Sequence, residues 1–128
     1  MSLDVSPELL AQAEAGDIDP AAFLDTVRES LPYAYAMVAG LSAELNSGEL
    51  EFADNQAPPA TEAERGQLLR ALASNAIRGS LEKHFGVRLA FQNCHRVAAF
   101  RPSATAAIAA FRSPRAQLLN QRPEFVDC

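Results

Sequence analysis

Residues 61–86 read TEAERGQLLRALASNAIRGSLEKHFG, and this stretch decides the expected fold. Thr61 and Glu64 form a capping box, in which both side chains bond backbone amides that a helix start leaves unpaired. Apolar residues then recur at helical spacing, and Gly86 is a typical residue after a helix end. We therefore predict one long helix over residues 61–85, and its expected core positions are Leu69, Leu72, Ala76, Ile77 and Phe85.

The hydrophobic period changes directly after this helix. Apolar residues alternate with polar or small ones from Val87 to Gln92, which is the pattern of a half-buried strand. The residues after Asn93 can pair back onto this strand. The pattern predicts a β-hairpin over residues 87–101 that turns near residues 92–94.

Proline-led helix starts mark the outer parts of the chain. Short helices are predicted over residues 7–15, in the alanine-rich segment that ends at Phe111, and from Pro114. The region from Pro20 to about Leu45 is expected to form either one helix kinked at Pro32 or two consecutive helices. Residues 46–60 carry turn-forming residues and few large apolar ones, so a long connection is expected there.

These elements predict an α+β fold, mostly helical, with a long central helix and one β-hairpin. A chain of 128 residues fits a single domain that can bury a core without metals or disulfides. We divide it into acidic N-terminal helices over residues 1–45, a linker loop over residues 46–60, and a basic part over residues 61–128.

Charge is distributed unevenly between the two halves. Residues 1–64 hold thirteen of the sixteen carboxylates and one basic residue, Arg28, whereas residues 65–128 hold ten of the eleven basic residues. The halves therefore carry about −12 and +7. Such asymmetry favours an electrostatically guided contact, either within one molecule or between molecules.

Composition excludes several classes of protein. A hydrophobic content of 48% with 21% charged residues is typical of a globular protein rather than a disordered one. No apolar run is long enough to span a membrane, and the residues from Met1 to Asp4 lack the basic region of a secretory signal. A cytoplasmic location is expected. No phosphate-binding glycine loop, nucleophile elbow or metalloprotease motif occurs.

Several phrases carry a resemblance to a known group of proteins. They are Phe52-Ala53-Asp54-Asn55-Gln56, Arg65-Gly66-Gln67-Leu68-Leu69-Arg70, His84 through Phe100, Gln117-Leu118-Leu119-Asn120-Gln121 and Asp127-Cys128. The chain resembles a family of small, uncharacterised, soluble actinobacterial proteins over almost its whole length. The resemblance implies a streptomycete-like, cytoplasmic origin and supplies no activity, cofactor or catalytic residue.

The cysteines and histidines all lie in the basic half. They are His84, Cys94, His95 and Cys128, four residues of the types that bind structural zinc. Their spacing is poor for a metal site, because adjacent residues of a strand point to opposite faces. Cys94, which has basic neighbours, and Cys128 are also candidate thiols, and we predict a structural role for Cys94. A Cys94–Cys128 disulfide is not expected in a reducing cytosol.

Arginines offer the third kind of candidate site. Arg70 and Arg78 lie eight residues apart on a predicted helix, and Arg88 and Arg96 could flank one face of the hairpin. Several arginines on one face could bind nucleic-acid phosphates, whereas contacts with acidic helices would explain them without a ligand.

We therefore predict a non-catalytic cytoplasmic interaction or regulatory protein without a cofactor, whose partner is unknown. The alternatives are a thiol- or metal-dependent activity centred on Cys94 and weak binding of nucleic acid through the arginines. A homodimer is expected, with an apolar centre drawn from Tyr33, Tyr35 and Met37 and a charged rim. In it, acidic residues such as Asp19, Asp25 and Glu29 would face the arginines of residues 65–115.

Overall fold

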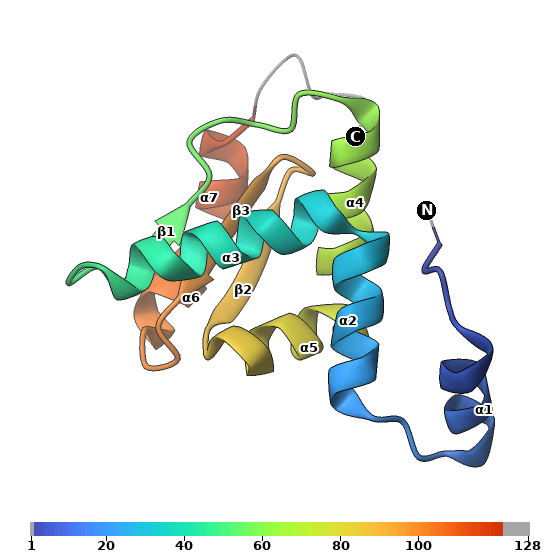
Figure 1. Ribbon diagram of the computed structural model, residues 1–128. Helices are drawn as coiled ribbons and strands as arrows, with labels where there is room; N and C mark the ends of the chain where they lie inside the picture. Colours follow the sequence, from blue (N-terminus) through green and yellow to red (C-terminus); the bar gives the residue numbers. More distant parts are fainter. Residues whose placement is uncertain (1, 122–128) are drawn as a thin grey trace.

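The computed structural model describes residues 2–121, which form seven helices and three strands (Figure 1). This mixture confirms the predicted α+β class. No helix within the described residues is both long and apolar enough to cross a membrane. The elements in chain order are α1 (Pro7–Ala15), α2 (Pro20–Ser30), α3 (Pro32–Asn46), β1 (Phe52–Asp54), α4 (Glu62–Ala73), α5 (Asn75–Phe85), β2 (Arg88–Gln92), β3 (Arg96–Phe100), α6 (Thr105–Phe111) and α7 (Pro114–Leu119).

The helix starts confirm the sequence signals. Ser6 and Asp19 cap α1 and α2 by accepting hydrogen bonds from backbone amides of the first turn, and a proline follows each cap. The chain between Ser30 and Pro32 breaks into two consecutive helices, because the proline has no amide to continue the ladder of α2. Gly16 ends α1 in the left-handed conformation, with φ of 76°.

The predicted long helix over residues 61–85 is wrong. Ser74 has extended backbone angles, φ −86° and ψ 119°, and separates α4 from α5. Its hydroxyl accepts a hydrogen bond from the Ile77 amide and so caps the start of α5. Serine and asparagine side chains compete with the helical backbone for hydrogen bonds, which makes Ser74-Asn75 a natural break.

The break also changes which residues are buried. Leu72 and Ile77 are buried as predicted, and Phe85 is partly buried against the core. Leu69, with 52% of its surface exposed, and Ala76 lie outside the core, contrary to prediction. The apolar stripe was predicted for one continuous helix, and the change of chain direction at Ser74 takes part of it out of the core.

The predicted hairpin is confirmed, and a third strand joins it. β2 and β3 pair antiparallel from Arg88↔Phe100 to Gln92↔Arg96. β1 lies in the segment expected to be a plain connection and pairs antiparallel with the other side of β3, which gives the order β1-β3-β2. Three residues are too few to show a period of two, so sequence periodicity could not reveal β1.

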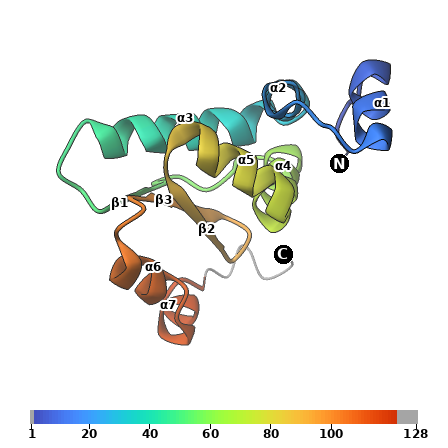
Figure 2. The same ribbon diagram turned by 90° about the horizontal axis from the view of Figure 1, so that it is seen from below.

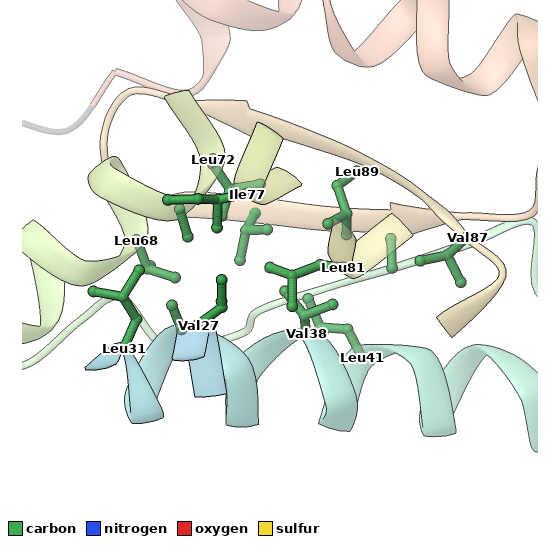
Figure 3. Packing of buried hydrophobic residues seen from close by; sticks show 14 of the residues in the cluster. Val27, Leu31, Val38, Leu41, Leu68, Leu72, Ile77, Leu81, Val87 and Leu89 are labelled. Atoms are coloured by element: carbon green, nitrogen blue, oxygen red, sulfur yellow. The ribbon is translucent and has the colours of Figure 1, made fainter. Parts of the chain in front are cut away.

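The two faces of the sheet are covered by different helices (Figure 2). α3, α4 and α5 lie on one face, and α6 and α7 lie on the other. Leu89 and Val97 belong to the larger core. Figure 3 shows Leu89 among side chains of this core that come from α2 to α5. Ala90 and Ala98, with the opposite parity along the strands, belong to a smaller cluster under α6.

Candidate nucleic-acid interface

The joint between α4 and α5 forms a hollow with the edge strand β2. This hollow has a volume of about 520 Å³. Because the chain turns at Ser74, the end of α4 and the start of α5 both lie beside β2 instead of continuing past it. The lining side chains are apolar except for two arginines, and they are Leu72, Ala73, Arg78, Leu89, Ala90, Phe91 and Arg112.

Arg78 is held in place on the helical side of the hollow. One terminal nitrogen of its guanidinium donates to the Leu72 carbonyl at 3.0 Å, and the other donates to Oδ1 of Asn75 at 2.7 Å. Its Nε lies 3.9 Å from a carboxylate oxygen of Glu82, a longer contact that offsets part of the charge. The guanidinium is therefore preorganised at the helix joint, which lowers the entropy lost when it binds an anion.

Arg112 stands on the opposite side, directly after α6. Its Nη2 donates to the Leu89 carbonyl of β2 at 3.3 Å, and the rest of the residue is exposed. The Leu89 amide is bonded to Glu82 Oε2 at 2.8 Å, so the backbone of residue 89 points to the open edge of the sheet. Phe91 has the same parity, and its backbone amide and carbonyl point to that edge as well.

A second hollow continues the first around the helix joint. Its volume is about 390 Å³, and Ala73 lines both. It adds the exposed side chain of Leu69 and the half-buried Arg70. The two adjoining hollows are together called the joint groove, and three arginines line it beside apolar side chains.

The four arginines predicted as an interaction set are divided between two places. Arg70 and Arg78 both reach the joint groove. Arg88 and Arg96 lie on the same face of the hairpin, as expected, but at opposite ends of it and under the α6 layer. Arg96 bonds Asp54 at 2.8 Å and lies 4.7 Å from the ring centre of Phe111, so it joins β1, β3 and α6.

The cysteine and histidine candidates within the described residues lie on either side of β2, in α5 and in the hairpin turn. His84 is exposed in the last turn of α5, next to the ring of Phe85. Cys94 and His95 lie in the turn after β2, and this five-residue strand, about 16 Å long, separates the turn from the end of α5. Cys128 is outside the described residues. No group of three or more possible metal ligands occurs in residues 2–121.

The environment of Cys94 differs from the expected reduced thiol. Its sulfur takes part in a disulfide bond, so the expectation of no disulfide, which rested on the redox state of the cytosol, is wrong for this structure. Cys94 and the preceding Asn93 have φ of 51° and 53°, the left-handed region that few residues other than glycine and asparagine adopt readily. His95 is buried, and its Nδ1 lies 2.6 Å from the Asn93 carbonyl oxygen. The turn therefore uses both residues as structural parts.

Sequence reasoning counted Arg112 only among the arginines of residues 65–115 without singling it out, and it missed Phe91 as part of a site. Arg112 follows an alanine-rich helix that is far from residue 78 in sequence, and the fold brings it beside the groove by packing α6 on the second face of the sheet. The alternation along residues 87–92 assigns Phe91 to the hairpin and says nothing about a groove. Neither residue carries a local sequence signal that places it at a groove.

Comparison with known proteins gives a family and no activity. A family model with the short name KH_NucS_shadow, described as "NucS shadow ORF", matches residues 1–128. The chain belongs to this family. No curated protein and no solved structure matches it.

Proposed function

We propose that the protein is a non-catalytic binding protein whose ligand is single-stranded nucleic acid, held in the joint groove. The observation that carries this proposal is the set of three arginines around an apolar floor. Arginines on a groove wall can bond the phosphates, while apolar and aromatic side chains support the bases. The lining of the groove contains no His, Cys, Asp or Glu, which favours binding over acid–base chemistry.

The family name lends support of a second kind. Its short name begins with KH, which is also the name of a class of domains that recognise single-stranded nucleic acids. The elements β1, α4, α5, β2 and β3 follow one another in the chain, and β3 lies in the middle of the antiparallel sheet. The description of the family refers to a reading frame rather than to an activity.

One departure from KH domains affects the mechanism. KH domains clamp the nucleic-acid backbone with a Gly-X-X-Gly loop. Here the joint between the helices reads Ala73-Ser74-Asn75-Ala76 and has no glycine. Close approach of the phosphates to the backbone is therefore less favourable, and the grip falls to Arg70, Arg78 and Arg112.

Fluorescence anisotropy with labelled single strands of RNA and DNA tests the proposal. Single strands should bind more tightly than a duplex of the same sequence, and affinity should fall as salt rises. Arg112→Gln should lower the slope of log affinity against log salt by about 0.7, the share of one phosphate contact on a single strand. Phe91→Leu, which keeps apolar volume, should weaken binding about tenfold if a base stacks on the ring.

Arg28→Gln is the matched control, because it also removes one positive charge but lies on α2, outside the joint groove. Affinity should change little in this variant. Equal losses in the Arg28 and Arg112 variants would show unspecific attraction, and no binding of single strands at low salt would refute the proposal.

Binding of a protein partner is the second candidate function. The actinobacterial origin and the cytoplasmic location remain predictions. An apolar groove between α2 and α5, separate from the joint groove, favours it. Among the ion pairs of the described residues, Asp54–Arg96 joins the acidic and basic halves over a long sequence distance. Asp25 instead pairs with Arg28 of its own helix.

A further inference from the structure

The groove between α2 and α5 has a volume of about 910 Å³ and a mostly apolar floor. Phe23 and Leu24 contribute from α2, Tyr35 from α3 and Ala76 from α5. Of the three residues predicted as a dimer centre, Tyr35 lines this groove, while Tyr33 and Met37 pack against the core of their own chain. An apolar hollow of this size is typical of a binding surface.

Charges surround this floor unequally. Lys83 and His84 in the last turn of α5 form one rim, and both are exposed. Within the described residues Lys83 has no ion-pair partner. On the other rim, Asp25 and Arg28 are paired at 2.9 Å and offset each other. The groove therefore favours an acidic occupant with apolar side chains.

Helix α1 of the same chain has this chemistry. Residues 1–17 contain four carboxylates and no lysine or arginine. Leu10 is 53% exposed, and Glu14 lies one turn further on the same side of the helix. Leu9 is the buried residue of α1, so most of the surface of this nine-residue helix is uncovered.

No residue of α1 itself lines the groove of its own chain, although Ile18, in the connection from α1 to α2, does. Figures 1 and 2 both show α2 between α1 and α5. The helix is anchored in that position, because Leu3 packs on the main core and the Asp4 amide bonds Ser30 Oγ at 2.8 Å. A helix so short is marginal without packing, and a contact on its outer face would stabilise it.

We propose that α1 of a second copy of this chain docks in the α2–α5 groove, and that each molecule of the pair inserts its α1 into the groove of the other. Leu10 enters the apolar floor, and Glu14 meets Lys83 and His84 at the rim. The mode is that of an amphipathic helix in a groove. Two such reciprocal contacts close as a two-fold dimer, whereas a contact made in one direction only would continue from molecule to molecule as an open polymer. The joint groove is not part of this contact.

Charge reversal in two separate proteins tests the pairing. Lys83→Glu should oppose Glu14 of another copy, and Glu14→Lys should oppose Lys83, so each variant alone should dimerise weakly. In a mixture, one molecule of each variant makes one native pair and one reversed pair, and heterodimers should form. Analytical ultracentrifugation from about 1 µM to about 1 mM, with one variant labelled, measures this over the usual range of Kd.

Leu10→Asp tests the apolar part of the contact. The dimer Kd should rise about tenfold or more, because each dimer contains the interface twice and buried anchors dominate such contacts. Leu118→Asp, at a leucine that is 72% exposed on α7, is the matched control and should leave the Kd unchanged. Circular dichroism checks that both variants keep their helices.

Two results would overturn the inference. A wild-type protein that is monomeric throughout the concentration series has no such contact. A dimer that both charge variants and Leu10→Asp leave intact forms through another surface. Loss of nucleic-acid binding without loss of the dimer would concern the proposed function and not this inference.

Discussion

The two faces of the sheet differ in how much they bury. The face under α3, α4 and α5 belongs to a core of sixteen buried residues, whereas the face under α6 belongs to a cluster of six. Leu89 and Val97 project from the hairpin on the first face, and Ala90 and Ala98 on the second. Small side chains let α6 approach the strands closely but bury less apolar area, so stability should be concentrated on the first face.

The joint groove lies where these two layers meet. Arg78 comes from the larger layer and Arg112 from the end of the smaller one. A ligand held between them would require both layers to be in place. The smaller layer can therefore matter more to binding than to stability.

The largest expected effect is the loss of a buried leucine from the main core. Leu72→Ala should lower the free energy of unfolding by about 2–5 kcal/mol, because it removes apolar contacts and leaves a cavity. Ile108→Ala in the smaller cluster should lie near the low end, about 2 kcal/mol, since α6 can settle onto the alanines. Denaturant melts measure both, and equal large costs would contradict the comparison.

The next effect concerns Arg101, directly after β3. Its guanidinium donates to the carbonyls of Leu45, Gly48 and Leu50 at 2.9, 2.7 and 2.7 Å. It thereby holds the end of α3 and the following loop against the sheet. Arg101→Ala should cost about 1.5–3 kcal/mol. Arg101→Lys should recover only part of this, because an ammonium group lacks the planar fork of donors, and thermal melts would reveal the difference.

A smaller effect is expected at Gln67, which connects two helices of the larger layer. Helix α3 has no side-chain cap from its own N-cap residue, Leu31. Oε1 of Gln67, on α4, accepts from the amides of Tyr33 at 2.7 Å and Ala34 at 3.2 Å. Gln67→Ala should cost about 1 kcal/mol, as for other lost caps. Gln67→Glu keeps the acceptor and should remain near wild type in the same melts.

The smallest effect depends on pH. Burial raises the pKa of Tyr33, and the nearby Glu64 carboxylate raises it further. The folded protein therefore holds this proton more tightly than the unfolded chain, so the stabilisation is present below the ordinary tyrosine pKa of about 10 and is lost as pH rises through the folded value. Tyr33→Phe should show a shallower loss of stability at high pH.

Absorbance of tyrosinate measures the same shift directly. The chain has two tyrosines, and in Tyr35→Phe only Tyr33 titrates. A midpoint at or below the ordinary value would contradict the assigned cause.

Local sequence determined where most helices begin and end and where the hairpin lies. Cap residues, helix-initiating prolines and the change of period act through neighbouring backbone groups, so they can be read without the rest of the chain. These signals placed α1, α2, α3 and the pair of β2 and β3. Ser74-Asn75 carried a local signal for the helix break as well, but the apolar stripe on both sides outweighed it.

Tertiary packing decided the features that depend on residues distant in sequence. β1 is a strand because β3 supplies its hydrogen bonds, and its three residues carry no period of their own. Arg112 meets Arg78 because α6 packs on the second face of the sheet. The net charges of the two halves follow directly from the sequence. Only the fold placed the arginines in a groove and the acidic α1 away from them. Contacts between residues that are tens of positions apart are set by packing rather than by local propensity.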